Sequence, residues 1–276
     1  MSTAIQKWLR KHLQLEDIVL ADLLGDILQA FQLILSGNPE IYGIVFRSLF
    51  FSGIAIILAI LWGTPIAMLI AMKEFRGKTI LKTIFNTLIG LPTVVLGLIL
   101  FLIFSKAGPL GFLGLLYTPG AIMIGQAILV TPILVSIGVS SIESVDTEIM
   151  SLAQTLGASE SQAQIAVLRE ALNGIILSDL ASFNRAIGEL GVVLMVGGNI
   201  AGGGIRTDVM TTSISRDVQI SEIGLAIALG ILLVLVLFTI NIIVVLLRKA
   251  NVLVELAKGP YSKLKRSRET KNGGNR

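Results

Sequence analysis

Long apolar runs without a single charge constrain this chain more than any other feature. A membrane-spanning helix needs about 20 mostly apolar residues in sequence. Four runs of this length contain no charged residue. A fifth run, residues 171–196, is equally long but contains Asp179, Arg185 and Glu189. The sequence therefore predicts an all-α membrane protein, a polytopic bundle of five transmembrane helices. The four uncharged runs are residues 49–72, 83–104, 121–142 and 223–247.

Composition supports this class and excludes several others. Only 14% of the 276 residues are charged and the mean hydropathy is +0.85, whereas soluble domains carry about 25% charged residues. The absence of cysteine excludes disulfides and Cys-ligated metals, and the lone histidine, His12, argues against a His-based metal site or a Ser-His-Asp triad. We expect no catalytic residue, metal or cofactor in this chain. The net charge is +4, and the basic residues lie beside apolar runs. This favours a membrane surface over nucleic acid as the partner.

The N-terminal residues 17–35 are ambiguous, because aspartates interrupt an apolar stretch. Asp22, Asp26 and Gln29 recur at helical spacing and form one polar stripe. We interpret this segment as an amphipathic helix lying on the membrane, with a sixth span as the alternative. The predicted organisation is an N-terminal helix or arm (1–40), a transmembrane domain (41–250) and a basic, disordered tail (251–276).

Basic residues in the short loops predict the orientation, because cytoplasmic loops are enriched in Lys and Arg. The connection after the first firm span and the C-terminal tail are rich in both, whereas residues 105–118 contain only Lys106. This places residues 143–170 and the tail in the cytoplasm, and residues 105–118 and 197–221 outside. Four charged residues of the second external segment are expected on the solvated surface: Arg206, Asp208, Arg216 and Asp217.

The long cytoplasmic connection, residues 143–170, has the signals of two short helices. Asp146 can cap a helix over residues 147–156, and Gly157 can end it in the left-handed conformation. Ser159 and Gln162 have the spacing of a capping box for a second helix. The sequence predicts a helix–turn–helix, and from these local signals alone an ordinary capped hairpin is an equal alternative.

Residues 151–159, Ser-Leu-Ala-Gln-Thr-Leu-Gly-Ala-Ser, resemble the "EAA" loop of ATP-binding cassette (ABC) importer permeases. In that family the first part of the loop is a coupling helix that docks into the ATP-binding subunit. The chain departs from the family pattern at Ser151 and Leu152, where Glu and Ala are usual, and at Arg169, where proline is common. The resemblance implies that five residues contact the ATP-binding subunit: Ala153, Leu156, Gly157, Ala158 and Ser159.

The charged run combines Arg185 with Glu189 one helical turn later. An isolated charge in mid-membrane costs about 2.5–3.5 kcal/mol on insertion scales, so the two side chains are expected to pair. The pair could simply lock helix packing, or it could line a pathway in which Arg185 attracts a passing anion. Asn184 and Asp179 would add polar lining in the second case.

Residues 184–191, Asn-Arg-Ala-Ile-Gly-Glu-Leu-Gly, resemble the R-A-x-G-E-x-G stretch of permeases for molybdate, tungstate and sulfate. Residues 108–116 and 195–200 are similar to external loops of tungstate-type permeases. The likeness covers most of residues 47–247 and implies a multi-pass protein of the prokaryotic inner membrane. It also implies two ATP-binding subunits and an external substrate-binding protein as partners. The residues themselves do not choose between tungstate and molybdate.

Other function classes fit the sequence less well. The chain has no G-x-x-x-x-G-K-[ST] phosphate loop, so ATP hydrolysis is expected from a separate subunit. A secondary transporter predicts internal repeats, and no convincing duplication is present. A membrane enzyme would need clustered His, Asp or Cys at the membrane face. Five spans are few for a complete pathway, so a homodimer with the path on its two-fold axis is expected.

Overall fold

The computed structural model describes residues 22–202 and 205–249, in which every regular element is helical. The tail prediction, the first part of the N-terminal arm and Gly203–Gly204 lie outside the described residues. Residues 22–35 form a helix that precedes the numbered elements. These elements are α2 (Pro39–Met72), α3 (Lys78–Leu88), α4 (Thr93–Phe104), η1 (Gly111–Leu113), α5 (Pro119–Glu143), α6 (Thr147–Thr155), α7 (Glu160–Glu170), α8 (Leu172–Ile187), α9 (Gly191–Gly197), α10 (Met210–Gln219) and α11 (Ile223–Lys249).

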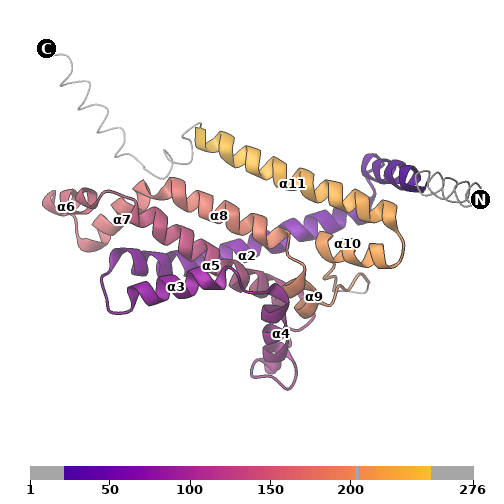
Figure 1. The fold of residues 1–276 in the computed structure, drawn as a ribbon, viewed down its shortest axis with the longest axis horizontal. Helices are drawn as coiled ribbons and strands as arrows, with labels where there is room; N and C mark the ends of the chain where they lie inside the picture. The colour runs from indigo at the N-terminus through magenta and orange to yellow at the C-terminus, as the bar shows by residue number, and fades with distance from the viewer. Residues whose placement is uncertain (1–21, 203–204, 250–276) are drawn as a thin grey trace, which may run out of the picture.

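Three long helices, α2, α5 and α8, form the centre of the bundle, and α5 packs against both of the others (Figure 1). Small residues make this close packing possible, as is usual where helices meet in a membrane. Ala55, Ala59 and Ala127 are fully buried in this contact. A Cβ atom on Gly63 would lie 2.8 Å from Leu134 Cδ2. The helices therefore approach closely at Gly63, where a larger residue would displace the terminal methyl group of Leu134.

Long, apolar and largely uninterrupted helices confirm three of the expected spans. α2, α5 and α11 are each long and apolar enough to cross a membrane. α2 has 34 residues and is about 51 Å long at 1.5 Å per residue, so it extends beyond the roughly 30 Å hydrocarbon layer. Pro65 and Pro132 lie inside continuous helices, as membrane bundles permit.

The expected span at residues 83–104 is not one continuous helix, and it passes as a candidate span only as a bent pair of helices. α3 ends at Leu88, α4 begins at Thr93, and the two axes differ by 100°. Gly90 and Pro92 lie in the break. Glycine has low helix propensity, and proline removes a backbone donor and disfavours helical geometry in the residue before it. Length and hydropathy alone therefore concealed a bend that these two residues impose.

The charged run at residues 171–196 is also broken, by 58° between α8 and α9. Gly188, Glu189 and Leu190 form the break. Arg185 consequently lies in the last turn of α8, and Glu189 lies beyond the end of that helix. The expectation that both occupy one continuous helical face was wrong.

The two breaks lie against each other, because α4 packs along α9. A Cβ atom on Gly191 would lie 2.6 Å from Thr93 Oγ1 and 3.0 Å from the backbone nitrogen of Val94. Gly97 is similarly close to Met195. The first turns of the two half-helices therefore meet without an intervening side chain.

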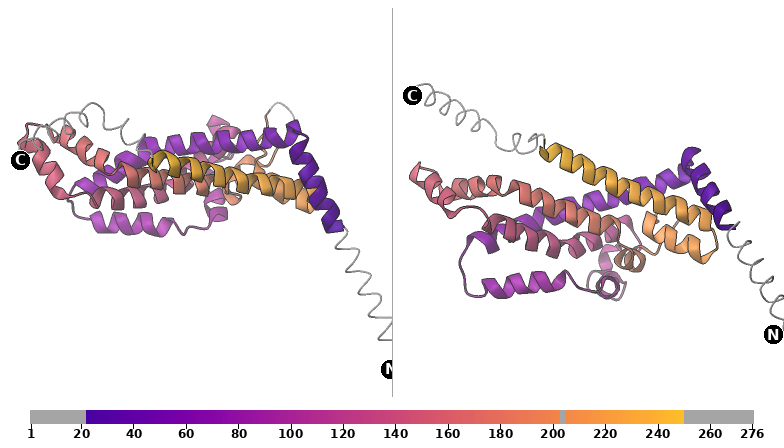
Figure 2. Two further views of the ribbon diagram at one scale, coloured as in Figure 1. Left: turned by 90° about the horizontal axis from the view of Figure 1, so that it is seen from above. Right: turned by 45° about the horizontal axis from the view of Figure 1, so that its top comes forward.

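The helices alternate in direction, so segments of like predicted sidedness gather at one end (Figure 1). α6, α7 and the connection between α2 and α3 share the end that basic residues mark as cytoplasmic. At the opposite end, Tyr117 donates its backbone N–H to Val196 O at 2.8 Å and joins the two external segments. The arrangement agrees with five spans in alternating direction. Figure 2 shows the same alternation from two further sides.

The helix of residues 22–35 lies at the external end and contacts α11. Ala30 is fully buried in a cluster that includes residues of α11, and the Gln29 side chain lies beside Gly224. Four apolar side chains at heptad-like spacing face outward instead, each at least half exposed: Leu24, Leu28, Phe31 and Leu35. An outward apolar face suits contact with lipid. Whether the segment lies on the membrane or crosses it stays a prediction.

Candidate functional site

The connection between α5 and α8 has the predicted helix–turn–helix geometry. Asp146 Oδ1 accepts the backbone N–H of Glu148 at 3.0 Å and caps α6. Gly157 has a φ of +88°, and the following residue, Ala158, donates its N–H to Ala153 O at 3.0 Å. Ser159 and Gln162 form both hydrogen bonds of the capping box at the start of α7. The local prediction is confirmed in each of these features.

Two leucines project from this loop without covering partners in the described chain. Leu152 is 61% exposed and Leu156 is 80% exposed, one helical turn apart on α6. Ala158 and Ala153 are half-buried, whereas Gly157 and Ser159 are exposed. Leu156 was predicted to be a contact residue, whereas Leu152 was noted only as a departure from the family pattern. Their shared exposure gives α6 an apolar tip suited to a groove in another subunit.

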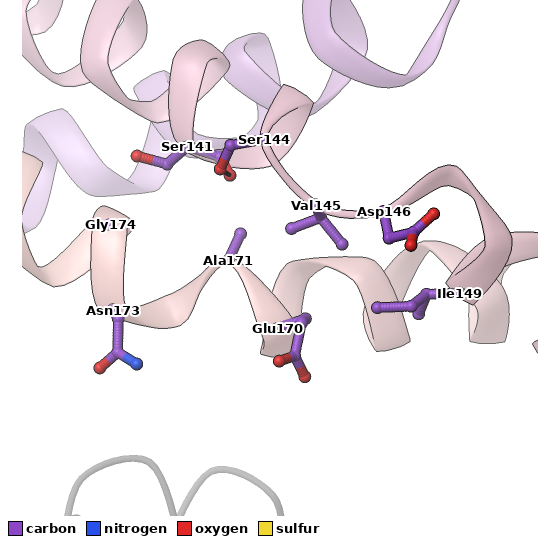
Figure 3. A pocket seen from close by; sticks show the side chains of 9 residues that line it. All are labelled: Ser141, Ser144, Val145, Asp146, Ile149, Glu170, Ala171, Asn173 and Gly174. Atoms are coloured by element: carbon purple, nitrogen blue, oxygen red, sulfur yellow. Dashed lines mark hydrogen bonds between the residues drawn. The ribbon is translucent and has the colours of Figure 1, made fainter.

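A cleft of about 390 Å³ lies behind this loop, between the end of α5 and the start of α8 (Figure 3). Ser141 and Ser144 of α5 lie on one side, and Ala171 and Gly174 lie across from them. Asp146 and Ile149 line the cleft toward α6. Ile149 and Met150 of α6 also pack against a core cluster that includes residues at the end of α5, so α6 contacts the spans beside this cleft.

Arg185 and Glu189 form the expected ion pair across the break between α8 and α9. Arg185 Nη1 lies 2.6 Å from Glu189 Oε2. The second carboxylate oxygen of Glu189 accepts the backbone N–H of Val192 at 3.0 Å, and its side chain is only 2% exposed. Glu189 thus places negative charge at the N-terminal end of α9, where the helix dipole favours it.

The Arg185 side chain is 36% exposed in the single chain. One N–H group of its guanidinium donates to Glu189, and no other hydrogen bond to Arg185 forms among the described residues. Guanidinium is the side-chain group best matched to an oxyanion, because its parallel N–H groups can bond two oxygens at once. The geometry thus gives Glu189 a structural role and leaves the Arg185 side chain partly exposed.

The other predicted polar residues of α8 do not join this pair. Asn184 exchanges two side-chain hydrogen bonds with Asn241 of α11, at 3.2 and 3.1 Å. Asp179 lies two turns before Arg185, and its Oδ1 is buried with no hydrogen-bond partner among the described residues. The structure thus separates Asn184, which ties α8 to α11, from the Arg185–Glu189 pair.

Three polar residues that bond to α8 or to the break after it were not predicted from the sequence. Gln126 Nε2 donates to Ala186 O at 2.9 Å, and Thr211 Oγ1 donates to Glu189 O at 2.7 Å. Asn241, described above, is the third. Polar side chains can satisfy backbone groups freed by a broken membrane helix. A usable signal existed for two of them, because Gln126 and Asn241 are the amide side chains of their otherwise apolar runs.

The external charged residues are not simply solvated, which corrects that expectation. The carboxylate of Asp208 is fully buried and pairs with both Arg47 of α2 and Arg206. Asp217 is likewise fully buried and pairs with Arg216 at 2.8 Å. A buried carboxylate needs such partners because desolvation is costly. The external segment is thereby fixed to α2.

Replacing Asp208 with asparagine should lower the melting temperature of the purified protein, since two guanidinium groups lose their anionic partner. Hydrogen bonds to charged groups are each worth about 1.5–3 kcal/mol, so a loss of roughly 2 kcal/mol is expected. Thermal unfolding in detergent measures it, with Glu222→Gln as the control at an exposed carboxylate of the same end. Equal melting temperatures for the two variants would contradict the role of Asp208 in fixing the external segment to α2.

Within residues 22–202 and 205–249, the structure has no cluster of three His, Cys, Asp or Glu that could hold a metal ion.

Comparison with known proteins agrees with these features. The family model described as "Binding-protein-dependent transport system inner membrane component" matches residues 63–251. That range includes both the helix–turn–helix and the Arg185–Glu189 pair.

Individual relatives are similar over most of their length. The chain is 36% identical over 215 residues to the tungstate uptake system permease protein TupB of Peptoclostridium acidaminophilum, covering 78% of this chain and 93% of the relative. It is 37% identical over 196 residues to a probable anion ABC transporter permease protein of Haloferax volcanii, covering 70% and 84%. A second tungstate uptake permease, from Campylobacter jejuni, is 32% identical over 233 residues, covering 84% and 96%.

Proposed function

This chain belongs to the family of binding-protein-dependent transport system inner membrane components, and from that membership we propose that it forms the pathway by which an ABC importer takes up tungstate. The observation that supports tungstate as the substrate is the likeness to two tungstate uptake permeases over most of their length. The open guanidinium of Arg185 supports an oxyanion as cargo. Molybdate, sulfate or another anion is the alternative cargo for the same pathway.

We further propose that two copies of the chain assemble with two ATP-binding subunits and one external binding protein. The exposed Leu152 and Leu156 would enter the ATP-binding subunit, together with Ala153, Gly157, Ala158 and Ser159. ATP hydrolysis belongs to that separate subunit, and no cofactor is assigned to this chain. A two-fold axis between the copies gives the anion a path that a single small bundle does not enclose.

Transport would proceed by alternating access between two packings of the spans. Closure of the ATP-binding subunits pushes α6, and the packing of Ile149 and Met150 on the core cluster transmits this displacement to the spans. Because α6 connects to α5 and α7 connects to α8, the push reaches two of the three central helices. Arg185, at the end of α8, would then meet the anion with its open N–H groups while Glu189 keeps the guanidinium in place.

Uptake by the reconstituted complex tests the proposal directly. The chain, its ATP-binding subunit and its binding protein are placed in proteoliposomes, and tungstate, molybdate and sulfate are offered with and without ATP. We expect ATP-dependent uptake that favours tungstate. A preference for another oxyanion would correct the cargo and keep the class. Uptake that needs neither ATP nor the partners would overturn the ABC assignment in favour of a secondary transporter.

A further inference from the structure

One face of α3 is polar, uncharged and uncovered. Thr79, Thr83 and Thr87 recur at four-residue spacing, and Asn86 lies next to Thr79 on the helical wheel, on the same side of the helix. All four side chains are exposed, and α3 has no buried residue at all. We call these four residues the hydroxyl face. Figures 1 and 2 show α3 at the edge of the bundle.

The remaining two faces of α3 have clear environments. Lys78 and Lys82 form ion pairs with Glu143 of α5, and Phe85 packs against a core cluster that includes α5 residues. Ile80 and Ile84 are exposed apolar side chains on a second face, which suits lipid. The hydroxyl face is neither the protein-facing nor the apolar side of the helix.

The depth of the hydroxyl face makes its polarity significant. α3 has 11 residues and is about 16 Å long, close to half of a roughly 30 Å hydrocarbon layer. It begins at the end predicted to be cytoplasmic, so its polar side lies along the inner half of the membrane.

The hydrogen bonding of the hydroxyl face differs between its members. Thr83 and Thr87 donate to backbone carbonyls one turn earlier, at 2.9 and 2.8 Å. The Asn86 amide has no hydrogen-bond partner in the part of the chain that the structure describes. An unpartnered amide is unfavourable in hydrocarbon, where no water can replace the missing bonds. Asn86 therefore indicates that this side of α3 meets water or a polar ligand instead of lipid.

We propose that the hydroxyl face lines the cytoplasmic half of the anion pathway, an inference that rests on the proposed transport function. Threonine hydroxyls can turn from their helix carbonyls to donate to a passing oxyanion, and Asn86 offers two further N–H donors. Lys73 and Arg76, both exposed with no ion pair among the described residues, lie in the connection just before α3 and favour anions at its mouth. Neutral donors bind weakly enough to let the anion leave, as conduction requires.

Cysteine accessibility can test this placement, because the natural chain contains no cysteine. Single variants Thr83→Cys and Ile84→Cys place a thiol on neighbouring residues that are both exposed in the single chain but face different directions. A negatively charged, membrane-impermeant methanethiosulfonate is applied to the cytoplasmic side of the assembled complex in inside-out vesicles. Thr79→Cys serves as a second hydroxyl-face variant if Thr83→Cys assembles poorly.

We expect Thr83→Cys to react at least about tenfold faster than Ile84→Cys, because a thiol in water ionises and a thiol in lipid does not. Modification of the Thr83→Cys complex should then remove most of its tungstate uptake. Slow reaction at both positions would overturn the inference, whether lipid or a second copy covers the face. Fast reaction with unchanged uptake would also overturn it, since the face would be wet but outside the pathway.

The unmodified chain separates this inference from the proposed function. If the natural complex takes up tungstate with ATP and modified Thr83→Cys does so equally well, only the placement of α3 fails. If the natural complex takes up no oxyanion, the transport proposal fails whatever the labelling pattern. An uncharged methanethiosulfonate of similar size is the matched reagent, and it should inhibit less than the anionic one.

Discussion

The variant Arg185→Ala is expected to lose at least nine-tenths of tungstate uptake and also to yield less folded complex. The loss of yield follows from Glu189, whose 2% exposed carboxylate would be left without its cation. Removing one partner of a buried pair typically costs about 3–5 kcal/mol. The loss of uptake follows from the anion-binding capacity of the guanidinium. Uptake must therefore be measured per folded complex, with thermal unfolding measured in parallel.

The double variant Arg185→Ala, Glu189→Gln separates these two effects. Glutamine can still accept the N–H of Val192 and cap α9, but it carries no charge that needs a partner. We expect the double variant to recover folded yield and to remain defective in uptake. If it recovers both, the pair serves packing alone and Arg185 does not act on the anion. Arg185→Lys, which keeps the charge and loses the bidentate geometry, should retain partial uptake.

Replacing Gly157 with valine is expected to reduce uptake roughly tenfold while ATP hydrolysis continues. A φ of +88° is strained for a β-branched residue, at a cost of about 1–3 kcal/mol. No atom lies within 4 Å of the position that a Cβ would occupy, so the strain arises in the turn and not from a collision. The turn is expected to relax and redirect Leu152 and Leu156 away from the ATP-binding subunit.

The number of ATP molecules hydrolysed per anion imported measures this uncoupling. Gly157→Asn is the matched control, because asparagine tolerates the left-handed region far better than valine. It should lie between the natural chain and the valine variant. Folding of the chain itself is expected to stay intact, because Gly157 is exposed at the tip of the loop. Normal coupling in Gly157→Val would contradict the role assigned to this turn.

The helix–turn–helix could be predicted in detail because its signals are local. Asp146, Gly157 and the Ser159–Gln162 pair each act within a few residues of sequence. The breaks in two spans were missed for the opposite reason: a run of apolar residues has the same composition whether it is straight or bent. Gly90 and Pro92 contained the signal for the first break, but membrane helices often tolerate such residues, as Pro65 and Pro132 show.

The Arg185–Glu189 pair was predicted correctly from spacing, although the intervening helix ends before Glu189. Its supports could not be predicted in the same way, because each belongs to a distant element. Gln126 reaches Ala186 across 60 positions of sequence, and Asp208 reaches Arg47 across 161. Local patterns contain no information about such pairs. This is why charges expected on a wet surface proved to be buried.

The meeting of the two bends has a consequence for protein engineering. Gly191 lies so close to Thr93 and Val94 that even a methyl group there would push both half-helices apart. The two bends therefore form a single packed unit, and neither can be redesigned alone. Attempts to change the transported anion should leave the contact of Gly191 with Thr93 and Val94 unchanged. They should vary exposed side chains instead. Grafting one bent segment from a relative would require its counterpart to be transferred with it.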